Sequence, residues 1–120
     1  MRKSTLFNKT SKYWPEINQF VLAVQVDDFP ESEADVKKIA NKIVEGLHLT
    51  KVNEIVHPFK PYGFTLVYVL SESHLALHTW PERKVLHIDL VTCSNLDRKT
   101  VQKEINNIFD LESSFIEWLN

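Results

Sequence analysis

The alternation of apolar and polar side chains over residues 85–93 restricts the fold of this chain more than any other feature. Leu86, Ile88 and Leu90 occupy one side of an extended segment, while His87 and Asp89 occupy the other. Because successive side chains of a strand point to opposite faces, this segment predicts a sheet with one apolar and one polar face. The apolar face then requires a second layer to cover it.

Two amphipathic helices can supply that layer. Between residues 31 and 47, apolar side chains recur at helical spacing, and residues 97–110 repeat the pattern. Further β-prone runs cover 19–26, 52–56, 64–70 and 113–119, and a Pro-rich loop is expected over 57–63. The order β-α-β-β-β-α-β predicts an α+β fold, a two-layer α/β sandwich with helices on one face of a largely antiparallel sheet.

Size and charge narrow the function classes. The 120 residues suit one domain over 19–120, preceded by an N-terminal arm over 1–18 that lacks steady periodicity. A net charge of -2 provides no basic surface, so neither nucleic acid nor an anionic membrane is expected as a partner, and a small-molecule substrate is favoured. The single Cys93, the absence of an apolar run long enough to cross a bilayer and the lack of a signal-peptide pattern favour the cytoplasm.

The segment 71–82, with the sequence SESHLALHTWPE, gathers hydroxyl, carboxylate and imidazole groups inside an otherwise apolar domain. Polar groups of this kind cost free energy when they are buried without partners. Their concentration within twelve residues therefore indicates a reaction centre.

Several simpler interpretations stay open for these residues taken singly. Ser73 is typical of a turn, Cys93 of a small buried apolar residue, and Phe59 of a core residue. His74 and His78 are four apart, but Pro81 disfavours a helix and no further ligand completes a zinc spacing, so we predict no metal. A Ser-His hydrolase would need a Gly-x-Ser-x-Gly turn, which the chain lacks. The remaining histidines, His48 and His87, are interpreted as structural.

The runs 71–74 and 78–82, followed by Asp89 and Thr92-Cys93, resemble the prokaryotic S-adenosylmethionine decarboxylase proenzymes. The resemblance implies self-cleavage between Glu72 and Ser73 into a β chain of 1–72 and an α chain of 73–120. Ser73 would become a pyruvoyl group, which forms a Schiff base with the substrate and acts as electron sink without metal or pyridoxal phosphate. The product would supply spermidine synthesis.

The resemblance also implies roles for individual residues. His78 would assist processing, together with the hydroxyl of Thr65, and Cys93 would return a proton to the substrate Cα after decarboxylation. Glu82 would bind ribose hydroxyls, and Phe59 would stack on adenine. The family further implies a homodimer of αβ units with active sites near the interface.

Three departures from the family pattern concern the substrate pocket. Leu66 follows Thr65 where a glycine is common, residues 83–85 lack the usual Gly-aromatic turn, and a Gly-x-His element is missing before the first strand. An arginine or ornithine decarboxylase that uses the same pyruvoyl group is therefore an alternative. A non-enzymatic regulatory subunit with this fold is a second alternative.

Overall fold

The computed structural model describes residues 16–120, so most of the arm expected over 1–18 lies outside the described residues. The elements, in chain order, are β1 (Asn18–Val26), α2 (Glu33–Gly46), β2 (Lys51–Pro58), β3 (Phe64–Leu70), β4 (Ser73–Trp80), the 3₁₀ helix η2 (Pro81–Arg83), β5 (Val85–Thr92), α3 (Arg98–Ile108) and β6 (Ser114–Trp118). No helix among these residues is long and apolar enough to cross a membrane.

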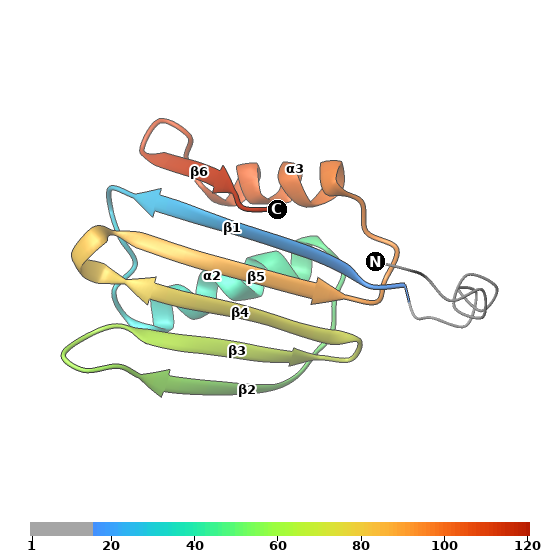
Figure 1. Cartoon of the computed structure of the whole chain (residues 1–120), viewed down its shortest axis with the longest axis horizontal. Helices are drawn as coiled ribbons and strands as arrows, with labels where there is room; N and C mark the ends of the chain where they lie inside the picture. Colours follow the sequence, from blue (N-terminus) through green and yellow to red (C-terminus); the bar gives the residue numbers. More distant parts are fainter. Residues whose placement is uncertain (1–15) are drawn as a thin grey trace, which may run out of the picture.

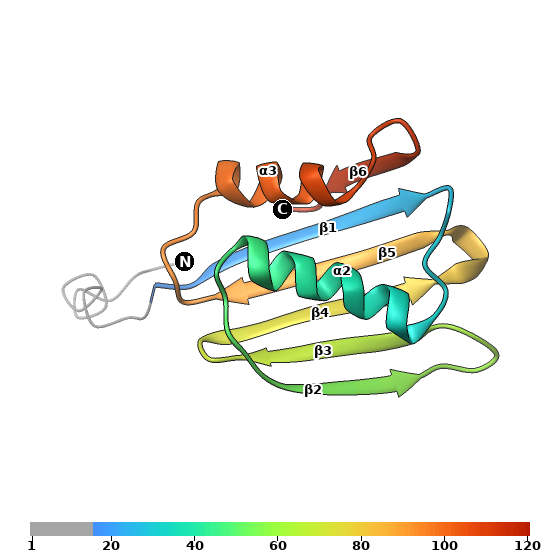
Figure 2. The same ribbon diagram turned by 180° about the vertical axis from the view of Figure 1, so that it is seen from behind.

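The strands form one antiparallel sheet in the order β2-β3-β4-β5-β1-β6 (Figure 1). Both helices lie on the same face of this sheet, α2 across its middle and α3 beside β1 and β6 (Figure 2). The expected α+β sandwich is thus confirmed. The predicted element order was wrong in one respect, because residues 73–80 form a strand of their own between β3 and β5.

The core lies between the sheet and the two helices. Leu86, Ile88 and Leu90 of β5 are fully buried there, as the alternation predicts, and they meet the apolar side of α2. No helix formed by residues 16–120 lies on the opposite face of the sheet, which we call the open face (Figure 1). His87 and Asp89 project from it, and cross-strand pairing places Thr65 and His78 on the same face.

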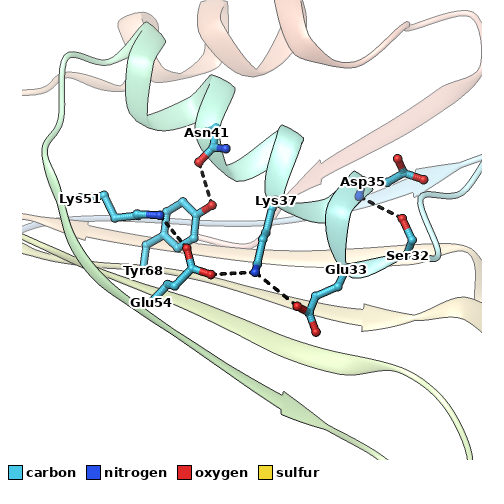
Figure 3. Close-up of polar contacts among 8 residues, drawn as sticks. All are labelled: Ser32, Glu33, Asp35, Lys37, Asn41, Lys51, Glu54 and Tyr68. Carbon is cyan, nitrogen blue, oxygen red and sulfur yellow. Dashed lines mark hydrogen bonds and ion pairs between the residues drawn. The ribbon is translucent and has the colours of Figure 1, made fainter.

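Side-chain caps fix where each helix begins. The Ser32 hydroxyl accepts a hydrogen bond from the backbone N–H of Asp35 at 3.0 Å and opens α2 (Figure 3). The Asp97 carboxylate accepts from Thr100 N–H at 2.8 Å and opens α3. Hydrogen bonds from the Thr100 side chain and then from its backbone N–H lower the pKa of Asp97.

Ion pairs tie the edge strand β2 to α2. The carboxylate of Glu54 lies 2.7 Å from Lys37 of the helix and 2.6 Å from Lys51 of its own strand, and Lys37 also pairs with Glu33 at 3.3 Å (Figure 3). Hydrogen bonds from Lys37 and then Lys51 lower the pKa of Glu54 to about 2. The Glu54 carboxylate therefore stays ionised, and its pairs persist, until the pH falls toward that value.

A buried tyrosine makes the other polar link between the layers. Tyr68 is fully buried, and its hydroxyl donates a 2.7 Å hydrogen bond to the Asn41 amide oxygen on α2 (Figure 3). We expect Tyr68→Phe to lower the free energy of unfolding by about 1 kcal/mol, because the exposed Asn41 regains water while the ring packing is kept. Urea unfolding, measured in an uncleavable chain, checks this value. A cost equal to that of a Tyr68→Ala cavity would contradict it.

Candidate active site

The peptide bond expected to break lies in the tight turn between β3 and β4. Ser73 is the first residue of β4, and its φ of 153° falls in a region that side-chain-bearing residues rarely adopt. Backbone strain is thus concentrated at the residue that follows the Glu72 carbonyl. Ser73 directly follows a turn, as the simpler interpretation of this serine expects. A turn alone does not explain the positive φ of Ser73.

The end of β5 lies against that carbonyl. Ser73 pairs with Thr92 across the sheet, and the backbone N–H of Cys93 donates a 3.1 Å hydrogen bond to the carbonyl oxygen of Glu72. A backbone donor in this position polarises the carbonyl and can stabilise negative charge that develops on its oxygen. The Cys93 side chain is exposed, so the interpretation of this residue as a small buried one was wrong. The structure therefore brings together Glu72, Ser73 and Cys93.

A small hollow of about 110 Å³ adjoins this group. It is lined by His48, Leu49, Thr50, Leu70, Ser71, Glu72, Thr92 and Ser94. The hydroxyls of Thr92 and Ser94 lie 2.6 Å apart and hold the turn that follows β5, on which Cys93 lies. Local hydrogen bonding therefore fixes the Cys93 backbone where it meets Glu72.

Thr65 and His78 form a second polar group on the open face. They are cross-strand partners on β3 and β4, and the Thr65 hydroxyl lies 2.7 Å from Nδ1 of His78 in hydrogen-bond contact. Burial lowers the pKa of His78, the neighbouring His87 lowers it further, and Asp89 opposes both. His78 is therefore neutral and able to accept a proton at a lower pH than an ordinary imidazole.

The two groups lie at opposite ends of β4. Ser73 begins the strand, and His78 lies five residues further along it, which in a β-strand corresponds to about 16 Å. Figure 1 shows the β3–β4 turn at one end of the sheet and the β4–β5 connection at the other. The structure therefore does not bring His78 or Thr65 to the Ser73 of the same chain.

The predicted substrate-binding residues lie at the Thr65–His78 end. Glu82 in η2 lines a hollow of about 350 Å³ together with Glu31, Tyr62, Gly63 and Pro81. Phe59 is 42% exposed and is not part of that lining, so its alternative assignment to the core was wrong. Tyr62, which the sequence analysis missed, provides the aromatic ring beside Glu82. The sequence feature that could have identified Tyr62 is its position in a loop with Pro and Gly, directly before a strand.

Gly63 sets the shape of this loop. Its φ of 93° favours glycine, and a Cβ at this position would lie 2.9 Å from the carbonyl oxygen of Thr79. The loop can therefore approach the end of β4 closely only with glycine at this position. This contact holds Tyr62 next to Pro81 and Glu82.

Within residues 16–120, no three side chains of the types His, Cys, Asp and Glu are grouped so that they could hold a metal ion. His74 lies 4.0 Å from Asp89 on the open face, a long and partly exposed contact.

Comparison with known proteins identifies the family. The family model described as S-adenosylmethionine decarboxylase matches residues 23–118, which include every element from the middle of β1 to the end of β6. The chain belongs to the S-adenosylmethionine decarboxylase family. Both polar groups of the candidate site lie within the matched segment.

Individual relatives of the S-adenosylmethionine decarboxylase family agree with this assignment. The chain is 37% identical over 68 residues to the S-adenosylmethionine decarboxylase proenzyme of Hydrogenobaculum sp., a match that covers 57% of this chain and 51% of the relative. The proenzyme of Picrophilus torridus is 44% identical over 70 residues, with 56% and 53% covered. The chain thus spans about half the length of these curated relatives in the matched segments.

A solved structure of the same family supports the fold. The crystal structure of the adenosylmethionine decarboxylase from Aquifex aeolicus superposes with a TM-score of 0.64 at 22% identity, covering 88% of this chain and 89% of that chain. At this level of identity the likeness establishes the arrangement of strands and helices. The individual roles of the site residues are a separate question.

Proposed function

We propose that this chain is a proenzyme that cleaves itself between Glu72 and Ser73 and then decarboxylates S-adenosylmethionine. The observation that carries the proposal is the 3.1 Å hydrogen bond from the Cys93 backbone N–H to the Glu72 carbonyl oxygen, next to a Ser73 with φ of 153°. A polarised carbonyl that precedes a strained serine is suited to attack by the serine hydroxyl. The named relatives are proenzymes, which supports processing in this chain too.

Cleavage begins with an acyl shift. The Ser73 hydroxyl oxygen bonds to the Glu72 carbonyl carbon, the peptide C–N bond breaks, and the proton passes from the hydroxyl to the released nitrogen, which leaves an ester. The Cys93 N–H stabilises the oxyanion of the tetrahedral intermediate in this step.

A base then completes the cleavage. It removes the Cα proton of residue 73, the Cβ–O bond breaks, and Glu72 leaves as the carboxylate terminus of the first fragment. The dehydroalanine left at residue 73 takes up water and loses ammonia to give a pyruvoyl group. We assign the role of base to His78, whose lowered pKa keeps the imidazole neutral and whose Nδ1 is held by Thr65.

The surroundings of residue 73 fit a pyruvoyl group. The position is partly accessible at the start of β4, and the exposed Cys93 thiol lies on the neighbouring chain segment, where it can deliver a proton to bound substrate. The pyruvoyl carbonyl supplies the electron sink that decarboxylation of an amino acid requires. Cys93 then acts as the proton donor to the substrate Cα.

The distance between Ser73 and His78 leads to a composite site. Because about 16 Å of strand separates them, His78 has to act on the Ser73 of a second copy of the chain. A two-fold axis that brings the open faces of two sheets together, with their β4 strands antiparallel, would place the Ser73 end of each β4 near the partner's His78. We therefore propose a homodimer with two shared sites.

The open face has the apolar side chains that such an interface needs. Ile55, Val69, Trp80 and Phe115 all project from it and are exposed in the single chain. They come from four strands across the whole sheet, and one protomer alone leaves them in water. Covering them would stabilise a dimer through burial of apolar surface.

The substrate would occupy the hollow beside Tyr62. Glu82 and Glu31 provide two carboxylates, and Tyr62 provides an aromatic face, a combination that suits a cation with hydroxyl groups attached. The sulfonium and ribose of S-adenosylmethionine match this description. Arginine and ornithine are also cationic, so both are included as rivals in the test below.

We expect mass spectrometry of the denatured protein to find two fragments, residues 1–72 and 73–120. The second fragment should be lighter by one ammonia molecule than the same sequence with an N-terminal serine, because the pyruvoyl group has lost the amine. An intact chain after prolonged incubation would contradict the proposed self-cleavage. It would favour the alternative of a regulatory subunit.

Reductive trapping identifies the substrate. Incubation with cyanoborohydride and labelled S-adenosylmethionine, arginine or ornithine should attach label to residue 73, and carbon dioxide release should be highest with S-adenosylmethionine. A cleaved protein that releases carbon dioxide only from arginine or ornithine would retain the pyruvoyl chemistry and overturn the substrate assignment.

A further inference from the structure

The ring of His87 lies beside the ring of His78 on the open face. The two are cross-strand partners on β5 and β4, and their ring centroids are 5.5 Å apart. The ring of Trp80 closes the group, 6.5 Å from His87 and 6.2 Å from His78. The ring of His78 is thus confined by Thr65 on the β3 side and by His87 on the β5 side.

The environment of His87 is unusual for a surface histidine. Its Nδ1 atom is buried and has no hydrogen-bond partner among residues 16–120. Most buried polar atoms of side chains in proteins have a hydrogen-bond partner. If His87 served only to pack the sheet, its buried and unpaired nitrogen would have no explanation.

We propose that His87 is a positioning residue for His78, because its ring lies against the catalytic imidazole on the side opposite the hydrogen bond from Thr65. The inference rests on the proposed function, in which His78 is the base of self-cleavage. A base needs an unprotonated nitrogen in a fixed place. Thr65 holds Nδ1 of the His78 ring by a hydrogen bond, and His87 lies against the ring from the neighbouring strand. Burial lowers the pKa of His78 most, and His87 lowers it further.

The charged and titratable groups that face the pair are few. On β5, Asp89 lies two residues from His87 and favours protonation of His78, against the effect of His87. The β1 residue opposite His87 is Ala23, and the neighbours Val21 and Gln25 on that strand carry no charge. Beyond Ala23, β6 contributes Glu117 in the same cross-strand row, two strands from His87.

On the other side, β3 contributes only the Thr65 hydroxyl, and β4 contributes His74, four residues from His78 and beside Asp89. Beyond Thr65, β2 contributes His57, one strand further from His78. Of these titratable neighbours, His87 lowers the pKa of His78 and Asp89 raises it.

The test is an NMR titration of the imidazole signals in the uncleavable Ser73→Ala chain, with and without His87→Phe. Phenylalanine keeps a ring at position 87 but cannot be protonated. We expect the pKa of His78 to rise by about half a pH unit, the size of the repulsion between two charged rings at this separation in water. His87→Ala should raise the pKa further, because water reaches the space that the ring leaves.

The matched control is His57→Phe, which makes the same change in the same cross-strand row, but one strand further from His78. It should move the pKa of His78 by less than half as much. An unchanged or lowered pKa in His87→Phe, or an equal rise in His57→Phe, would overturn the inference. Folded-state amide spectra of each variant ensure that the comparison concerns folded chains.

The pH dependence of self-cleavage tests the role of His87 in the reaction. In the chain with Ser73 present, His87→Phe should move the pH midpoint of cleavage upward by the same amount and slow cleavage about threefold below that midpoint. A midpoint that stays in place while the pKa of His78 moves would overturn the role of His87 in the reaction. If the parent chain does not cleave at all, the proposed function fails, while the titration still decides whether the two rings are coupled.

Discussion

Ser73→Ala should leave the chain whole and lower decarboxylation by at least about a thousandfold, because the variant has neither the hydroxyl that attacks Glu72 nor the atom from which the carbonyl cofactor is made. Denaturing mass spectrometry should find one species of 120 residues, and no labelled amine should be trapped by cyanoborohydride. Activity near that of the parent would rule out the proposed cofactor.

The matched control is Ser71→Ala, two residues earlier in the same turn. The hydroxyl of Ser71 has no role in the proposed reaction, and its backbone N–H, which the substitution keeps, donates to Thr50 at 2.9 Å. This variant should therefore cleave at close to the parent rate. Its failure to cleave would mean that the turn is too sensitive for the Ser73 result to identify the nucleophile.

Cys93→Ala separates cleavage from turnover. Its backbone N–H remains and can still donate to the Glu72 carbonyl, so the chain should cleave, whereas the thiol proposed to protonate the substrate is gone. We expect a processed protein with a low kcat. A variant that turns over like the parent would remove Cys93 from the catalytic steps.

The sequence predicted the layers of this fold better than the strands at its centre. Alternation over 85–93 and the helical periodicity of 31–47 correctly indicated which side chains are buried. Residues 73–80 were not assigned to a strand, because Ser73, His74 and His78 give the segment the composition of a loop. Hydrogen bonding to β3 on one side and β5 on the other, which local sequence does not reveal, makes it a central strand.

The same limit applies to the candidate site. The sequence identified Ser73 and His78 as functional candidates, but a spacing of five residues in an extended strand separates them by about 16 Å. The backbone N–H that contacts Glu72 belongs to Cys93, and nothing in a side-chain pattern predicts that contact. His87 appeared structural because its neighbour across the sheet depends on strand register.

Co-expression of Ser73→Ala with His78→Ala should restore cleavage that neither variant achieves at the parent rate alone. In a two-fold dimer with shared sites, the site that combines Ser73 of one copy with His78 of the other survives in the mixed dimer. Random pairing then places about half of the His78→Ala chains opposite a partner that supplies His78. Those chains should cleave at the parent rate, whereas Ser73→Ala chains stay whole.

Mass spectrometry distinguishes the two chains, because each substitution changes the mass of the fragment that carries it. The matched control pairs His78→Ala with a chain that carries both substitutions and so offers no His78. There, rapid cleavage should disappear. If the His78→Ala chain cleaves equally slowly with either partner, His78 acts within its own chain or not at all, and the shared site is wrong. This outcome would require β4 to depart from its extended form, because an intact strand keeps Ser73 and His78 about 16 Å apart.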